Sequence, residues 1–149
     1  MRRAAAGFLL LALGCSSSGP RIAREEPEIT VRQISNVADA ARQISGNITV
    51  QYSVTIHNTT STLLTLKRAD LQSIGAGAYT LPPTSKPFNV VLSPGETQTV
   101  ELWAPAVIED VTVAGANGPV TIRGILQFDS PTGQFQSVVV QQVHASGGV

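Results

Sequence analysis

The feature that most constrains this chain is a strict alternation of apolar and polar side chains from Asn47 to Asn58. Successive side chains of a β-strand point to opposite faces, so this pattern predicts a strand with one buried and one solvated face. The apolar members, every second residue, are Ile48, Val50, Tyr52, Val54 and Ile56. The apolar face of such a strand must be covered by a second layer.

Two turns predict β-hairpins further along the chain. Residues 93–96 read Ser-Pro-Gly-Glu, and proline second with glycine third suits a type II turn. We expect Pro105 to end the strand after that turn, because proline cannot donate to a ladder. Residues 130–133 read Ser-Pro-Thr-Gly, a type I signature that joins an alternating strand from Val120 to Phe128 with a strand from Phe135 to about Val143.

Residues 28–144 thus read as about seven or eight short strands separated by turns. This predicts an all-β fold, an antiparallel immunoglobulin-like β-sandwich. The run from Val138 to Val140 is apolar on both faces, which indicates a central strand or an interface. The only candidate helix is 36–45, with Asn36 as its cap and Gly46 after its end, and a bulged loop is an equal alternative there.

Charge and cysteine content exclude several classes of protein. The chain has 149 residues, with ten basic and ten acidic side chains and a sequence pI near 6.7. Such a balance offers no basic patch for nucleic acid. A single cysteine allows no intrachain disulfide, so apolar packing alone must stabilise the sandwich.

The first fifteen residues carry a targeting signal. Arg2 and Arg3 precede an apolar run over 4–13, which is too short to span a bilayer core of about 30 Å. The segment 11–15, Leu-Ala-Leu-Gly-Cys, resembles the lipobox of bacterial lipoproteins, although alanine stands where leucine is commonest. The resemblance implies cleavage before Cys15 and acylation of that residue, so we expect the membrane as a partner through acyl chains.

These signals divide the chain into four parts. Residues 1–14 are the predicted lipoprotein signal peptide, 15–27 the lipidated N-terminus and tether, 28–144 the β-sandwich and 145–149 a disordered tail. Ser16 stands where some bacteria place an aspartate to retain lipoproteins in the inner membrane. By resemblance to that sorting rule, we expect the cell envelope, at the periplasmic face of the outer membrane.

A second resemblance concerns the body of the chain. The segments 52–58 and 64–71, the turn at 92–96 and the strand at 120–124 are similar to the LEA-2 or WHy type of β-sandwich. The Asn-Pro-Asn that commonly follows the first long strand in that family is replaced here by Asn58-Thr59-Thr60. The resemblance implies a non-catalytic, stress-protective domain, and another immunoglobulin-like module is the alternative.

Groups for chemistry are few. His57 falls on the polar face of its strand and His144 lies near the C-terminus, so both are interpreted as surface histidines. A metal site needs three or four converging ligands, and no cluster of histidine, cysteine, aspartate and glutamate supplies them. The neighbouring pair Glu109 and Asp110 is interpreted as loop charge. We predict no catalytic residue, no metal and no cofactor.

The remaining hypothesis is a binding or structural module with an envelope protein as partner. Trp103, Val138 and Val140 are the candidate contact residues. Trp103 has the parity opposite to the core, and capping the rim of the sandwich is the favoured alternative to a contact role. An enzyme would instead require a deep polar pocket joining Asp129, Glu101 or His57.

Overall fold

The computed structural model describes residues 25–35, 47–108 and 118–144, which form seven strands and no helix. The strands are β1 (Glu28–Gln33), β2 (Asn47–His57), β3 (Leu64–Ser73), β4 (Thr84–Leu92), β5 (Thr97–Val107), β6 (Pro119–Ser130) and β7 (Gly133–His144). The predicted all-β class is confirmed. The candidate helix at 36–45, the predicted signal peptide at 1–14 and the predicted tail at 145–149 lie outside the described residues.

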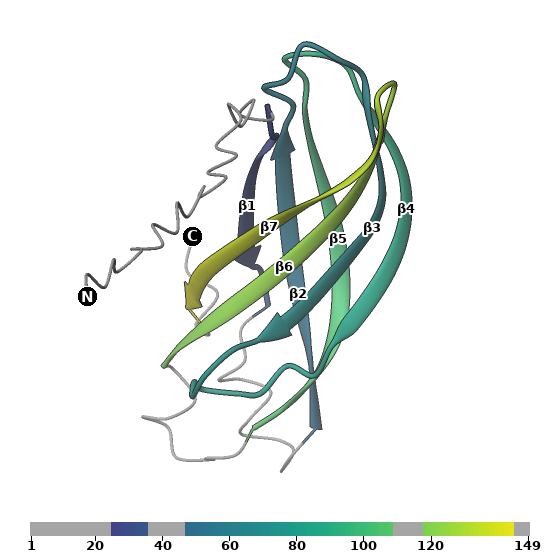
Figure 1. The fold of residues 1–149 in the computed structure, drawn as a ribbon. Helices are drawn as coiled ribbons and strands as arrows, with labels where there is room; N and C mark the ends of the chain where they lie inside the picture. Colours follow the sequence, from purple (N-terminus) through teal and green to yellow (C-terminus); the bar gives the residue numbers. More distant parts are fainter. Residues whose placement is uncertain (1–24, 36–46, 109–117, 145–149) are drawn as a thin grey trace, which may run out of the picture.

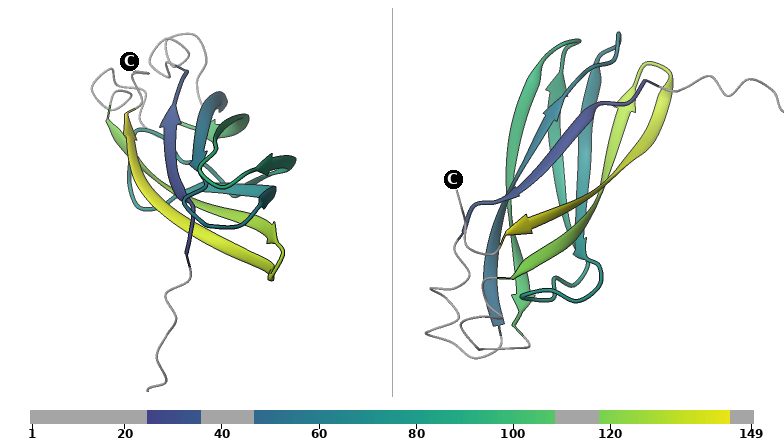
Figure 2. Two further views of the ribbon diagram at one scale, coloured as in Figure 1. Left: turned by 90° about the horizontal axis from the view of Figure 1, so that it is seen from above. Right: turned by 90° about the vertical axis from the view of Figure 1, so that its left-hand side faces the viewer.

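The strands form two antiparallel sheets (Figure 1). One has the order β1-β2-β5 and the other the order β4-β3-β6-β7. Figure 1 shows β6 and β7 running obliquely across β1 and β2, and Figure 2 shows the same two layers from above and from the side. The chain changes sheets after β2, after β4 and after β5, so the connections produce the predicted immunoglobulin-like sandwich.

The core lies between the sheets and follows the alternation in the sequence. All five apolar residues of β2 are buried, and Val50, Tyr52, Val54 and Ile56 have no exposed surface. They belong to one cluster with the inward side chains of the other sheet, including Leu66, Leu126 and Phe128. Burial of each large apolar side chain contributes about 1.5–3 kcal/mol to the free energy of unfolding. This packing stabilises the sandwich in place of a disulfide between the sheets.

Two local features adjust the four-stranded sheet. Between Leu66 and Arg68 the register shifts: β3 has one residue more than β6 there, and β4 has one residue more than β3. Lys67 and Arg68 of β3 are both exposed. Gly124 of β6 faces the core where a Cβ atom would lie 2.9 Å from the Val139 side chain and 3.1 Å from that of Leu71. Glycine at this inward position therefore avoids a steric clash with the Val139 and Leu71 side chains.

One prediction about strands is wrong, and one pair of alternatives is narrowed to a single one. Pro105 does not end its strand, because β5 continues to Val107 and Thr49 of β2 pairs with Pro105. A proline is tolerated there because β5 is an edge strand, and the missing N–H would point away from the sheet. Of the two alternatives for the run Val138–Val140, the central strand is excluded, since β7 lies at the edge of its sheet, and the interface stays a prediction. The predicted glycine turn is confirmed, with Gly95 at φ 77°.

A chain of hydrogen bonds crosses the core. The Tyr79 hydroxyl donates to Gln33 Oε1 at 2.6 Å, and the hydroxyls of Tyr52 and Tyr79 lie 2.6 Å apart. Because the Tyr79 proton is directed to Gln33, the Tyr52 hydroxyl donates to Tyr79. Both rings are buried, and burial raises the pKa of Tyr79 to about 12 and that of Tyr52 further. This network ties β1 and β2 to the segment before β4.

The free energy of unfolding is therefore expected to fall as pH rises above about 10. Each tyrosine binds its proton more tightly in the folded state, so its contribution is complete below the unfolded pKa and is lost above it. The loss approaches about 1.4 kcal/mol per pH unit for each buried tyrosine. Since the chain has only two tyrosines, tyrosinate absorbance should appear together with the loss of β-sheet circular dichroism. Tyrosinate formation in a still-folded protein would contradict this expectation.

Asn58 fixes the loop between β2 and β3. Its side chain is fully buried, and Nδ2 donates to the carbonyls of Thr62 (2.9 Å) and Leu92 (3.0 Å). Its Oδ1 accepts from the main-chain N–H of Thr60 (3.1 Å) and from the Thr60 hydroxyl (2.7 Å). Both ends of the amide are thus satisfied, and only an amide offers donors and acceptors in this arrangement.

The backbone of Asn58 joins the same loop to the turn before β5. Its N–H donates to the Glu96 carbonyl at 2.9 Å, and its carbonyl accepts from Gly95 N–H at 2.8 Å. The Ser93 main-chain N–H and the Gln98 amide donate to the Glu96 carboxylate, which lowers the pKa of Glu96. One end of the sandwich is consequently held together by polar contacts.

Residues 25–27 belong to the same end of the body. Pro27 is buried, and Thr59 Oγ1 donates to the Glu26 carbonyl at 2.8 Å. The Ser61 main-chain N–H donates to the Glu25 carboxylate at 3.1 Å. Part of the segment assigned to the tether is therefore bound to the sandwich beside the β2–β3 loop.

Candidate functional site

Trp103 lies on the outer face of β5. Alternation along this strand buries Leu102, Ala104 and Ala106 and directs the intervening side chains outward. Trp103 is 58% exposed and Val107 is 40% exposed. With the exposed Pro105 between them, these residues form an apolar row that we call the β5 stripe: Trp103, Pro105 and Val107. The parity argument is confirmed, because Trp103 faces outward on β5, an edge strand; capping of the rim stays a prediction.

Polar groups from both neighbouring strands, β2 and β4, meet Glu101 beside the β5 stripe. Gln51 of β2 pairs with Trp103, and its Nε2 donates to the Glu101 carboxylate at 2.8 Å. Lys86 Nζ, from β4, donates to the main-chain carbonyl of Glu101 at 2.9 Å. An exposed aromatic ring beside fixed polar groups can bury its face against a partner while the polar groups direct orientation.

Val138 and Val140 lie on the outer face of the other sheet. They are 55% and 57% exposed. The register places Val138 opposite Ile125 and Val140 opposite Arg123 of β6. We call the three apolar residues, Ile125, Val138 and Val140, the β7 patch.

The structure does not bring the three predicted contact residues together. The β5 stripe and the β7 patch lie on the outward faces of different sheets, with the core between them. They can therefore serve two different contacts. Cys15 lies outside the described residues, as do Glu109 and Asp110.

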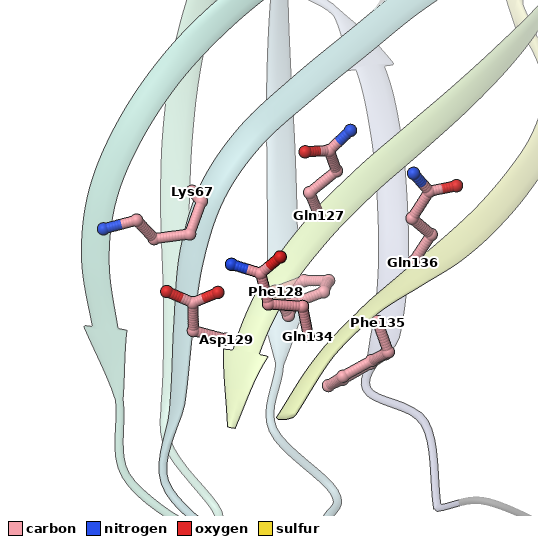
Figure 3. Close-up of a pocket in the computed structure, with 7 residues that line it drawn as sticks. All are labelled: Lys67, Gln127, Phe128, Asp129, Gln134, Phe135 and Gln136. Carbon is pink, nitrogen blue, oxygen red and sulfur yellow. The ribbon is translucent and has the colours of Figure 1, made fainter. Parts of the chain in front are cut away.

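A polar depression lies near the β6–β7 hairpin (Figure 3). It has a volume of about 200 Å³. Its lining residues are Lys67, Gln127, Phe128, Asp129, Gln134, Phe135 and Gln136. The rings of Phe128 and Phe135 stack with centroids 5.4 Å apart. Lys67 Nζ is engaged by Asn89 Oδ1 at 3.0 Å. The depression offers side-chain amides and one carboxylate for hydrogen bonding.

This depression was not predicted, although the sequence around residues 130–133 contains a pattern that indicates it. Polar residues alternate with the inward apolar residues on both sides of the 130–133 turn, and hairpin pairing aligns them. Asp129 pairs with Gln134, and Gln127 pairs with Gln136. A short turn at 130–133 therefore predicts that these polar side chains lie next to one another on the outer face of the hairpin, once the apolar residues are assigned to the inner face.

A second cleft separates β1 from the end of β7. It has a volume of about 300 Å³. It is lined by Val31, Arg32, Gln33, Gln141, Gln142, Val143 and His144. Gln141 Oε1 accepts the main-chain N–H of Val31 at 2.9 Å and so links the two sheets at this edge.

The groups that would indicate an enzyme do not meet. Asp129 faces outward on the four-stranded sheet, whereas Glu101 and His57 face outward on the three-stranded sheet. His57 Nδ1 lies 2.9 Å from Thr97 Oγ1. Within residues 25–35, 47–108 and 118–144, no three metal-ligating side chains form a group. Over the same ranges, no helix has the length and apolar character needed to cross a membrane.

No family model matches the chain, and no curated protein matches it. Several solved structures are similar in fold. Northeast Structural Genomics Consortium target SoR45 has 13% identity and a TM-score of 0.50, with 79% of this chain and 84% of that chain covered. A protein from Archaeoglobus fulgidus has 6% identity, a TM-score of 0.50 and coverage of 83% and 99%. The putative ApaA protein from Bordetella pertussis has 20% identity, a TM-score of 0.50 and coverage of 78% and 89%. At these identities the similarity concerns the fold alone.

Proposed function

We propose that this chain is a lipid-anchored, non-catalytic binding module of the bacterial cell envelope. Acylation of Cys15 holds it at the periplasmic face of the outer membrane, and the β5 stripe contacts an envelope protein. The observation that carries the binding role is the exposure of Trp103, at 58%, in line with Pro105 and Val107. Tryptophan is enriched among the residues that dominate binding energy in protein interfaces.

The anchor is supported by the lipobox resemblance of residues 11–15. A single acyl chain binds a membrane weakly, and two or more chains bind durably. The ten steps from Cys15 to Glu25, at about 3.3–3.6 Å each, span at most about 36 Å. Because residues 25–27 contact the body, this length limits how far the sandwich stands from the bilayer.

Replacement of Cys15 tests the anchor. Cys15→Ala removes the only thiol that could carry acyl chains, so the protein is expected in the soluble fraction after cell lysis. Ser16→Ala is the matched control and should stay with the membranes. Retention of Cys15→Ala through a carbonate wash would refute the anchor.

Replacement of Trp103 tests the binding surface. Crosslinking in intact cells followed by purification should recover an envelope protein, and Trp103→Ala should reduce its yield about tenfold or more, which corresponds to about 1.4 kcal/mol. The stability of the variant should change by no more than about 0.5 kcal/mol, because the ring is exposed. Thr99→Ala, on the same face of β5, is the control. Equal recovery with Trp103→Ala, or no crosslinked envelope component, would refute the binding role.

A second candidate function is stress protection of the LEA-2 or WHy type. It is supported by the position of the similar segments, which fall on β2, β3, the turn before β5, and β6. This function predicts that the purified chain protects unrelated enzymes from drying or freezing, and that Trp103→Ala protects equally well. Protection no better than an albumin control would remove it.

A further inference from the structure

The edges of the two sheets differ in how their backbone groups are used. An edge strand presents unpaired N–H and C=O groups that another strand can join, and proteins commonly block such edges. The four edges of this sandwich are β1, β5, β4 and β7. Three of them carry blocking features along the strand itself; β7 does not, although its inward side chains Ser137 and Gln141 contact Glu26, just before β1, and Val31 of β1.

The free side of β5 is occupied. Thr80 and Val107 exchange two main-chain hydrogen bonds, each 2.8 Å long. Pro105 has no N–H to offer, and the Glu101 carbonyl accepts from Lys86 Nζ at 2.9 Å. A further strand would have to displace these contacts.

The edges at β1 and β4 are also blocked. β1 has only six residues, and the N–H of its Val31 donates to Gln141 Oε1 at 2.9 Å. β4 contains Pro87 and Lys86 near its middle. Proline and lysine on an edge both disfavour the addition of a strand.

By contrast, β7 has twelve residues without proline, aspartate, glutamate, lysine or arginine. The Ile74 N–H donates to the Thr121 carbonyl, so the N–H and C=O groups of Thr121 point toward β3. The N–H and C=O groups of the next residue, Ile122, therefore point to the other side, toward β7. Ile122 pairs with Gln141, and the odd-numbered residues of β7 therefore bond to β6. The even-numbered residues direct their backbone groups to the open side, and in the described part of the chain none of these groups has a backbone partner.

The sequence of β7 is chemically symmetric about Val139. Reversal of the strand about this residue superimposes side chains of similar character. The matched pairs are Val138 with Val140, Ser137 with Gln141, Gln136 with Gln142, and Phe135 with Val143. Antiparallel pairing of two copies about a twofold axis at Val139 would place these pairs opposite each other, without juxtaposed like charges.

We infer that β7 pairs in antiparallel orientation with β7 of a second copy of this chain, about a twofold axis at Val139. The even-numbered residues then form the hydrogen-bonded pairs, as their backbone direction requires. Val138 lies beside Val140 of the second copy, so the two β7 patches become one continuous apolar surface. The pairing closes as a dimer, because the opposite edge of each sheet contains Pro87.

Disulfide trapping tests this register in the full chain. Val139 meets its own copy at the axis as a non-hydrogen-bonded pair, with Cα atoms about 4.5 Å apart, which suits a disulfide. Val139→Cys should therefore give a covalent dimer under mild oxidation. Gln136→Cys should not, because two copies of residue 136 would lie about 20 Å apart along the strands. The parent chain, which has Cys15 alone, controls for that thiol.

A second arm uses exposed positions that the fold tolerates. Chains with Gln136→Cys and chains with Gln142→Cys should crosslink to each other when mixed, and neither should crosslink alone. Addition of Val140→Lys, which places a charge on the edge, should reduce trapping through Val139→Cys at least tenfold. Equal dimer yields from all single-cysteine chains, no dimer from any of them, or a disulfide to a different polypeptide would overturn the inference. The inference is independent of the anchor, because the purified chain is expected to pair whether or not Cys15 is acylated.

Discussion

Replacement of Asn58 by aspartate is expected to lower the free energy of unfolding by about 3–5 kcal/mol, because it buries an uncompensated charge. The aspartate has the same shape, but an oxygen replaces the Nδ2 that donates to the Thr62 and Leu92 carbonyls. Those two carbonyls would then face a carboxylate with no exposed surface around it. Denaturant unfolding of the purified chain at neutral pH measures the effect.

The control is Asn89→Asp. Asn89 is exposed on β4, and its Oδ1 accepts from Lys67, a contact that aspartate keeps. We expect a change within about 0.5 kcal/mol for this variant. The penalty of Asn58→Asp should also shrink at acidic pH, since burial raises the pKa of the new carboxyl and protonation restores one donor. Equal stability of the two variants at neutral pH would contradict the role assigned to Asn58.

The second large effect is expected for Tyr79→Phe, which should cost about 2–4 kcal/mol. Its hydroxyl is the middle of the buried chain, where it accepts from Tyr52 and donates to Gln33. Tyr52→Phe removes only the terminal donor, so a smaller loss of about 1 kcal/mol is expected. Thermal or denaturant unfolding of both variants, at the same neutral pH, tests this order.

A reversed order, with Tyr52→Phe the more damaging variant, would show that the hydroxyl protons are arranged differently. The double variant provides a further control, because it lacks both groups whose pKa is raised by burial. Its stability should depend less on pH above about 10 than that of the parent chain.

Much of the fold was predictable because local patterns coincide with tertiary burial. The alternation in β2 predicts its buried face, and the Pro-Gly sequence at 94–95 predicts a turn that requires positive φ. Each of these patterns is confined to a few neighbouring residues, so it can be recognised from the sequence. The order of strands in the two sheets could not be predicted in this way, since it depends on pairings between distant segments.

The wrong prediction for Pro105 and the excluded central position of Val138–Val140 have the same physical origin. Proline disrupts a strand only where its N–H would be needed, and at Pro105 the backbone points away from the sheet. The valines at 138–140 are apolar on both faces, a composition shared by central strands and by open edges. Sequence alone gives no position in the sheet, and both outcomes depend on that position.

The candidate surfaces were predicted only in part. Parity placed Trp103 on an outward face, and Val138 and Val140 were candidate contact residues, but the sequence could not show that two separate sheets carry them. The hydrogen bond between Tyr79 and Gln33 joins residues 46 positions apart, so no local pattern reveals it. The binding of residues 25–27 to the β2–β3 loop was hidden for the same reason.

The central claim, an acylated cysteine at the head of the processed chain, is tested most directly by mass spectrometry of the N-terminal peptide from membrane extracts. The peptide is expected to begin at Cys15 and to carry the mass of several acyl chains. A peptide that contains Cys15 with a free thiol, or that retains residues 1–14, would contradict it.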